Sequence, residues 1–403
     1  MKIVGFLYRI ILLFSILWGA HAWFTWWIEA IPYASQASMV LIAAIALLYR
    51  IRMRLPLRKD PSVFVIFILW MLAFLSAYEI SFAMLLGIII RFIPLWILIS
   101  DKNCSDHLQW IKKYIAILLF PGLIIHILYI ISPFPSIPIQ YGNSMTYIFY
   151  NYIFNIEVMS PWIETSYRFQ SVFLEPGYLG TLLCFLLYAD RYNFKDKYTK
   201  ILLIALVFSF SLAGYIISFM GYLLYKRNVG INFTRIVGVF VLLIAFCLVA
   251  STYKNGDNVF NERIISRLRF DKEKGIQGNN RNGYTTDYYF NRVLTSDKIF
   301  FGLSNEEISQ INGDDDGYAD EENKLHGAGF KLFVVVYGIL PVLFYFLFYL
   351  LTASQCGYHR RYSLGFFFLI LLTFIQASYP NSFCWLIPFI LGINNRTPLQ
   401  RRQ

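Results

Sequence analysis

The residues best suited to chemistry stand together in RFQSVFLEPGYLG at 168–180. Arg168 and Glu175 carry opposite charges there, and a Pro-Gly pair follows that would interrupt a helix. The next residues, TLLCFLLYA, are typical of a membrane-spanning segment. An ionisable group at a membrane entrance is costly unless it is paired or used. Glu175 could accept a proton from an attacking group, or it could cap its own helix.

A second set of candidate residues lies in the polar segment 252–328. Its first part is basic and its second part is acidic, and Arg281 and Arg292 stand among aromatic residues and Gly/Asn turns. Guanidinium groups pair bidentately with phosphate, and tyrosine faces such as those of Tyr178 and Tyr284 suit sugar rings. Together they favour an anionic lipid headgroup that carries sugars. A solvated loop surface would explain most of the arginines equally well.

Two more candidates stand within or beside apolar runs. Arg91 interrupts LLGIIIRFIPLWILI, and a mid-span arginine must face a partner or a water-filled cavity. We predict a substrate-binding role for it, and a structural pair with Glu79 or a backbone carbonyl is the alternative. His326, in KLHGAGFKLF, could act as an acid-base group or a phosphate ligand, or it could be an interfacial residue without a role.

The sequence predicts no metal site and no cofactor. The acidic run INGDDDGYADEEN matches the calcium loop of an EF-hand only in part, because Asn323 stands where a bidentate Glu is needed. Its D-x-D spacing resembles that of nucleotide-sugar transferases, whose substrates are cytoplasmic. The five cysteines are scattered without a C-x-x-C pair, which argues against zinc and structural disulfides. A requirement for a divalent metal stays open.

Composition places the chain in a membrane. Of its 403 residues 58% are hydrophobic and only 15% are charged, and the mean hydropathy is +0.54. We predict an all-α polytopic membrane protein, with 1–403 forming a single integral membrane domain. The net charge of +11 could suggest nucleic acid. Lys and Arg that gather in cytoplasmic loops explain it better, so we expect membrane lipids and no nucleic acid as partners.

The hydropathy pattern predicts about twelve spans, since each needs roughly 20 apolar residues. The apolar runs fall near 4–24, 32–49, 61–79, 82–100, 113–132, 172–190, 200–211, 212–225, 236–251, 329–352, 362–377 and 382–394. Basic residues at both ends of 200–225 and of 362–394 favour a hairpin in each case. Both termini are then inside, and the long loops 133–171 and 252–328 are outside.

Two local features need a choice of interpretation. The first 25 residues imitate a secretory signal, with Ala20-His21-Ala22 like a cleavage site, but an uncleaved first span is expected. From Pro176 to Asp190 a helix would reach only about 22 Å, too short to cross. We therefore predict that this helix begins near Ser171, with Pro176 inside its first turns.

The layout and several motifs resemble the O-antigen polymerase family. The most specific piece is R-F-x-S-x-F-x-E-P-G at 168–177, followed by the Ser/Gly-rich run FSFSLAGYIISFMG at 208–221. Weaker pieces are N-R-x-G at 280–283, F-G-L at 301–303, and H-G-A-G-F leading into a span with Y-G-I-L at 326–340. The layout covers most of the chain, whereas the motifs cover about a tenth of it.

The resemblance implies a membrane glycosyltransferase of the bacterial inner membrane with a periplasmic active face. Such enzymes join undecaprenyl-diphosphate-linked oligosaccharide units in lipopolysaccharide biosynthesis, and a chain-length regulator is a further expected partner. Arg168, Arg281 and Arg292 would stabilise the leaving diphosphate, Glu175 would take a proton, and His326 would assist. An O-antigen ligase, a lipid-linked oligosaccharide flippase or other transporter, a non-catalytic partner and a capsule polymerase are the alternatives. The Gly-Ala-Gly after His326 favours polymerase over ligase.

Overall fold

The computed structural model describes most of the chain. The described residues are 2–77, 81–142, 148–159, 168–229, 284–312, 329–376 and 381–395, with 249, 252–253, 261, 270–271, 275–276 and 325. They are mostly helical, as predicted. The helices are α1 (Lys2–Gly19), α2 (Trp27–Ala30), α3 (Ala34–Met53), α4 (Pro61–Leu75), α5 (Phe82–Ser100), α6 (Cys104–Ile131), α7 (Pro176–Ala189), α8 (Lys197–Phe208), α9 (Leu212–Val229), α11 (Tyr284–Leu294), α12 (Asn305–Asn312), α13 (Phe330–Tyr337), α14 (Ile339–Leu351), α15 (Arg360–Gln376) and α16 (Phe383–Ile393).

Four helices in the described part of the chain are long and apolar enough to cross a membrane. They are α3, α5, α6 and the continuous helix Ile339–Cys356, which joins α14 to a turn of π-helix. Shorter apolar helices cover Ile3–Gly19, Pro61–Leu75, Pro176–Ala189 and Phe383–Ile393. The prediction of about twelve spans is therefore not supported. Apolar composition does not show where a helix stops, and the 14 residues of α7 reach only about 21 Å.

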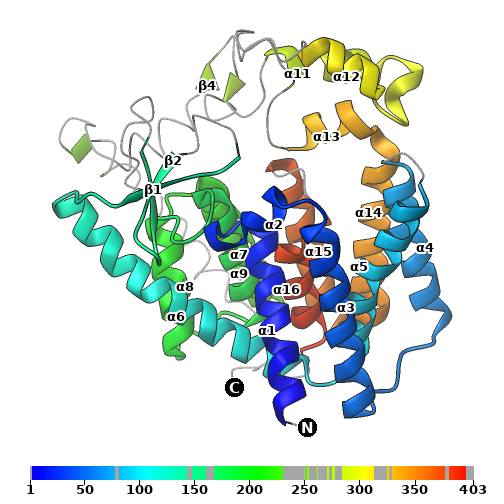
Figure 1. Ribbon diagram of the computed structural model, residues 1–403, viewed down its shortest axis with the longest axis horizontal. Helices are drawn as coiled ribbons and strands as arrows, with labels where there is room; N and C mark the ends of the chain where they lie inside the picture. The colour runs from blue at the N-terminus through cyan, green and yellow to red at the C-terminus, as the bar shows by residue number, and fades with distance from the viewer. Residues whose placement is uncertain are drawn as a thin grey trace.

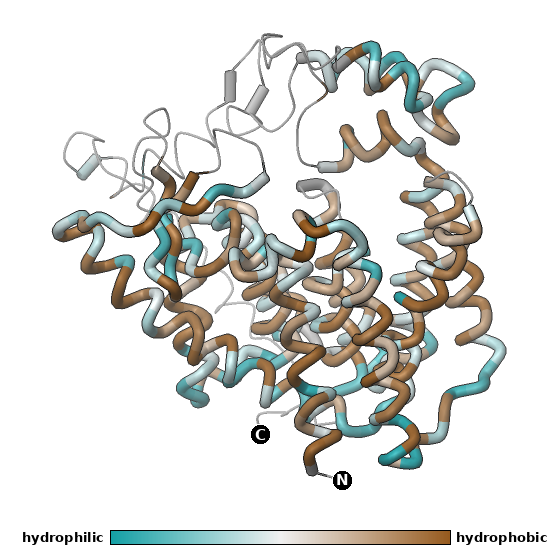
Figure 2. The backbone as a smooth tube through the Cα atoms, viewed as in Figure 1, coloured by the Kyte–Doolittle hydropathy of each residue, from teal (hydrophilic) through white to brown (hydrophobic). Residues whose placement is uncertain are grey.

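The bundle has two distinct ends (Figure 1). The start of α1 and the end of α16 lie at one end, which we call the terminal end. The other, which we call the loop end, carries α2, α11, α12 and strands β1 (Ile137–Gln140), β2 (Ile148–Asn151) and β3 (Ile156–Val158). Both long predicted loops thus contribute described elements to the same end. Figure 2 shows hydrophobic residues along the bundle helices and hydrophilic ones on α11 and α12.

The first long loop contains a small sheet, which corrects the all-α prediction. Its strand order is β1-β2-β3, and both pairings are antiparallel, with Phe149 opposite Ile139 and Val158. Alternating β-branched and aromatic residues favour strands over helix here. Buried Phe149 and Ile156 pack with Trp26, which attaches the sheet to the bundle. A second antiparallel pair joins β4 (Phe270–Asp271) to β5 (Gly275–Ile276).

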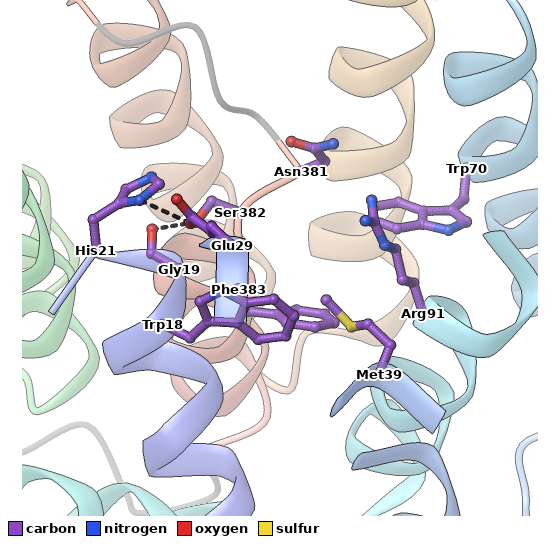
Figure 3. A pocket seen from close by; sticks show the side chains of 10 residues that line it. All are labelled: Trp18, Gly19, His21, Glu29, Met39, Trp70, Arg91, Asn381, Ser382 and Phe383. Atoms are coloured by element: carbon purple, nitrogen blue, oxygen red, sulfur yellow. Dashed lines mark hydrogen bonds and ion pairs between the residues drawn. The ribbon is translucent and has the colours of Figure 1, made fainter. Parts of the chain in front are cut away.

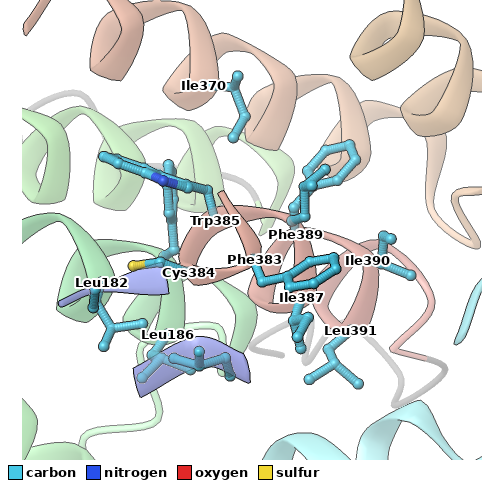
Figure 4. Close-up of a cluster of buried hydrophobic side chains, with 14 of the residues drawn as sticks. Leu182, Leu186, Ile370, Phe383, Cys384, Trp385, Ile387, Phe389, Ile390 and Leu391 are labelled. Carbon is cyan, nitrogen blue, oxygen red and sulfur yellow. The ribbon is translucent and has the colours of Figure 1, made fainter. Parts of the chain in front are cut away.

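Helix α16 is the centre of the core (Figure 4). Every residue from Phe383 to Ile393 is buried, and the helix packs against α1, α5, α6, α7 and α15. A helix that is hydrophobic all round is expected in such a central position. Gly19 lets α1 approach closely, because a Cβ there would lie 2.7 Å from the Cys384 nitrogen. The Ser382 hydroxyl donates to the Gly19 carbonyl at 2.8 Å.

The predicted hairpin breaks are confirmed, and one further break was missed. Helices α8 and α9 separate at 209–211, where Phe210 has a φ of 44°, and α15 and α16 are likewise separate helices. The run 329–352 is not one helix, because Gly338 divides α13 from α14 with a φ of 78°. A Cβ at Gly338 would collide with the Phe300 carbonyl, which accepts a hydrogen bond from the Leu340 nitrogen. The second loop is thus fastened to this bend.

Helix α7 begins at Pro176, so the prediction of a start near Ser171 was wrong. Ser171 has a φ of 52°, and Phe173 forms an isolated β-bridge with Ala22. Pro176 occupies the first helical position, where its missing N–H costs nothing. Glu175 is therefore the N-cap residue and does not lie within the helix.

Candidate functional site

A pocket of about 170 Å³ opens among the ends of several helices near the loop end (Figure 3). Its walls combine aromatic faces with ionisable and polar groups. The lining residues are Trp18, Gly19, His21, Glu29, Met39, Trp70, Arg91, Asn381, Ser382 and Phe383. Such a mixture of apolar surface and a few convergent polar groups is typical of a small-molecule site. The volume is below the roughly 300–1,000 Å³ of sites that enclose a drug-sized ligand, so it suits only part of a larger molecule.

Arg91 is the cation of this pocket. It lies nine residues after Phe82, about 14 Å along α5, and is half-buried. Its guanidinium carbon lies 5.8 Å from the centre of the Phe74 ring, a cation–π contact. Arg91 forms no ion pair with any of the described residues, and the alternative partner Glu79 lies outside them. Its charge is thus directed at the pocket.

His21, Glu29 and Tyr141 form a hydrogen-bonded group on the other side of the pocket. His21 Nδ1 lies 3.2 Å from Glu29 Oε1, and the Tyr141 hydroxyl donates to Glu29 Oε2 at 2.7 Å. The side chains of His21 and Glu29 are 23% and 37% exposed, so both remain accessible. Burial alone raises the pKa of Glu29, but the hydrogen bonds from His21 and Tyr141 outweigh it and lower that pKa below its usual value. Glu29 is therefore a carboxylate at neutral pH.

The stretch 168–180 helps to hold His21 in place. The Trp23 nitrogen donates to the Val172 carbonyl at 2.9 Å, and the Leu174 nitrogen donates to the His21 carbonyl at 3.2 Å. The same carbonyl accepts from the Trp26 indole at 2.9 Å. These bonds stabilise His21 in a left-handed backbone conformation, with a φ of 52°, that non-glycine residues seldom adopt. The motif thus supports the pocket from outside it.

The predicted site residues are only partly brought together. Arg91 lines the pocket, and the ring of Tyr178 lies 5.2 Å from that of His21. Glu175 is half-buried at the start of α7, where its side chain makes no capping hydrogen bond. Arg168 Nε donates to the Ser209 carbonyl at 3.4 Å, at the turn between α8 and α9.

The other predicted site residues are away from the pocket or outside the described part of the chain. Arg292 is exposed in the last turn of α11 and does not line the pocket. Tyr284 begins α11, but its side chain is not among those described. Arg281, His326 and residues 313–323 of the acidic run lie outside the described residues, so their roles stay predictions.

Sequence reasoning missed His21, Glu29, Trp18 and Trp70. One signal was available, because segment 22–31 contains no Lys or Arg and Glu29 is its single charged residue. An isolated carboxylate between two apolar runs needs an explanation. Only the fold brings this segment close to Arg91 and Tyr178.

Among the described residues, other largely buried ion pairs lie outside the pocket. Lys112 Nζ lies 2.7 Å from Asp190 Oδ1 and 2.8 Å from Asp196 Oδ2. His107 Nε2 lies 2.9 Å from Asp101 Oδ2. At the loop end, His126 Nδ1 lies 2.6 Å from Glu157 Oε1, which also accepts from the Asn155 amide at 2.6 Å. Each of these ion pairs joins two separate parts of the fold, so a role in stability explains its burial.

Comparison with known proteins assigns the chain to no family. No protein-family model, no curated protein and no solved structure matches the chain. The fold itself defines a mostly helical protein with several helices suited to a membrane and a pocket near one end.

Proposed function

We propose that this protein is a membrane glycosyltransferase that joins oligosaccharide units carried on a polyprenyl diphosphate, as O-antigen polymerases do. The observation that carries the proposal is Arg91, a cation without a described carboxylate partner in a pocket that the indole of Trp18 helps to line. A diphosphate that leaves from a sugar carbon needs positive charge, and sugar rings pack on indole faces. The motif resemblance at 168–177 supports the same class of reaction.

The position of the pocket suits a substrate that is half lipid. Arg91 belongs to α5, a helix long enough to cross a membrane, so a prenyl chain could remain in lipid while its diphosphate reaches the guanidinium. The small volume fits a diphosphate and the adjoining sugar, with the rest of the oligosaccharide extending towards the loop end. The proposal includes the bacterial inner membrane as the location and its periplasmic face as the side of the loop end.

A deletion strain provides the test. We expect its lipopolysaccharide to carry a single repeat unit, because one unit can be ligated but not extended. Long chains in that strain would contradict the proposal. Absence of any repeat unit would point to a ligase or a flippase instead.

Complementation of that strain tests the pocket itself. Arg91→Ala should lower chain lengthening roughly 10²–10³-fold, the usual effect of removing one electrostatic stabiliser. Arg91→Lys should restore only part of the activity, because an ammonium group cannot pair bidentately. Arg52→Ala is the matched control, since Arg52 is exposed on α3 and does not line the pocket. Normal chains with Arg91→Ala would remove the assigned site.

A further inference from the structure

We propose that His21 removes the proton from the attacking sugar hydroxyl and that Glu29 holds His21 in the orientation this needs. The inference deepens the proposed function and rests on it. It differs from the prediction that Glu175 takes the proton, because Glu175 occupies the N-cap position of α7 and does not line the pocket.

The hydrogen bonds around the imidazole decide which nitrogen could act as the base. Nδ1 faces the Glu29 carboxylate at 3.2 Å, and it also lies 3.4 Å from the Tyr141 hydroxyl. A histidine nitrogen that faces a carboxylate carries the proton, so the neutral ring has its lone pair on Nε2. Nε2 is therefore the nitrogen that could accept a proton from a hydroxyl.

Glu29 and Tyr141 prepare the pair for this role. The Tyr141 hydroxyl occupies Glu29 Oε2, which leaves Oε1 for His21 and fixes the plane of the carboxylate. The lowered pKa of Glu29 keeps it ionised, so it would stabilise the imidazolium that forms. Tyr178, in the first turn of α7, packs against His21 with ring centres 5.2 Å apart, and this contact limits rotation of the imidazole.

The two sides of the pocket have different roles in the proposed reaction. Figure 3 shows His21 and Glu29 on one side and Arg91 on the other. In the proposed step, the hydroxyl oxygen forms a bond to the anomeric carbon while its proton passes to His21 Nε2. The bond between that carbon and the diphosphate oxygen breaks, and its electron pair leaves with the polyprenyl diphosphate, whose charge Arg91 stabilises. The imidazolium then releases its proton to water.

The test uses purified protein and the lipid-linked repeat units extracted from the deletion strain. We expect His21→Ala to lower kcat roughly 10²–10⁴-fold, the usual contribution of a general base, with little change in KM. Added imidazole should restore part of the rate. His21→Gln, which retains a polar side chain, should be equally slow, and both variants should match the wild type in gel filtration.

Glu29 is a positioning residue and needs its own measurement. Glu29→Gln should lower kcat with KM unchanged, because the amide keeps the shape but not the charge that stabilises the imidazolium. Glu306→Gln is the matched control, since Glu306 is exposed on α12 and does not line the pocket. Equal losses of kcat in Glu29→Gln and Glu306→Gln would overturn the role of Glu29.

The outcomes separate this inference from the proposed function. Wild-type rates in His21→Ala, with Arg91→Ala inactive, would overturn the inference and leave the proposed function standing. A raised KM in His21→Ala without rescue by imidazole would assign His21 to binding and also overturn it. Wild-type protein that does not lengthen the lipid-linked units would overturn both.

Discussion

Replacement of Lys112 by Met should destabilise the fold by about 3 kcal/mol, near the lower limit for breaking a buried ion pair. Lys112 on α6 is 1% exposed, and its partner Asp190 at the end of α7 is 2% exposed. Without the ammonium group, a carboxylate would stay buried next to apolar helices. This pair joins two helices of the bundle, so its loss affects the whole fold.

The size of the effect follows from the bonds that remain. Asp190 Oδ1 would still accept from the Gln109 amide at 2.8 Å, and Oδ2 would still accept from the Thr199 hydroxyl at 2.6 Å. These two bonds compensate part of the lost charge, so we expect the lower end of the usual range of about 3–5 kcal/mol. A loss of 3 kcal/mol changes the ratio of folded to unfolded protein roughly 150-fold.

The free energy of unfolding can be measured in mixed micelles with a thiol-reactive dye. Cys104, Cys184, Cys356 and Cys384 are buried free thiols, so they become reactive only on unfolding. The control is Lys113→Met, which removes a neighbouring but exposed lysine.

Two outcomes of this experiment are decisive. Lys112→Met that stays within about 0.5 kcal/mol of the wild type would refute the reasoning. The double variant Lys112→Met with Asp190→Leu should recover most of the loss, because an apolar pair of similar volume often replaces a buried ion pair without cost.

Three further predictions concern pH, a turn and the loop-end sheet. Burial raises the pKa of Asp196, but its bonds to Lys112 and neighbouring groups lower that pKa overall. The stability that Asp196 contributes is therefore present above its unfolded-state pKa and is lost as pH falls through the lower folded-state pKa. Acid unfolding curves of Lys112→Met should show a smaller loss of stability than those of the wild type. Gly338→Ala should cost about 1–3 kcal/mol in the dye assay, since a Cβ there meets backbone at a left-handed φ, and an unchanged midpoint would contradict this. Glu157→Gln should weaken the contact with His126 and speed limited proteolysis within 133–171, whereas an unchanged cleavage rate would mean that the sheet is held by its apolar contacts alone.

Much of the fold class could be predicted from the sequence. The apolar runs identified α3 and α5 closely, and Pro94 does not interrupt α5. Helix α6 begins at Cys104, nine residues before the predicted run, because its first turns are polar and carry no hydropathy signal. The breaks at 209–211 and after Gln376 were also predictable, since basic residues flank each pair. The number of spans was not, because a buried helix and a membrane-spanning helix have the same composition.

The candidate site was harder to predict, since it depends on contacts between distant segments. Arg91 was recognisable, because an arginine within an apolar run requires a cavity or partner. The support that 168–180 gives to the pocket could not be predicted, because its pairing with residues 21–23 is visible only in three dimensions. His21 resembled part of a cleavage site, and nothing in its own neighbourhood predicted that Tyr141 would reach Glu29.

The short central helix α16 has a consequence for how the protein meets the bilayer. Its 11 residues reach only about 16 Å, and α7 is also short, yet both are buried by other helices. The longer α3, α5 and α6 have only 22%, 39% and 39% of their apolar windows buried, so in a bilayer these helices would face lipid and match its hydrophobic thickness, and the interior helices would incur no mismatch. Because α16 begins only at Phe383, the space above it is left for the pocket. A central helix of full membrane length would fill that space, so the cavity depends on a helix too short to cross alone.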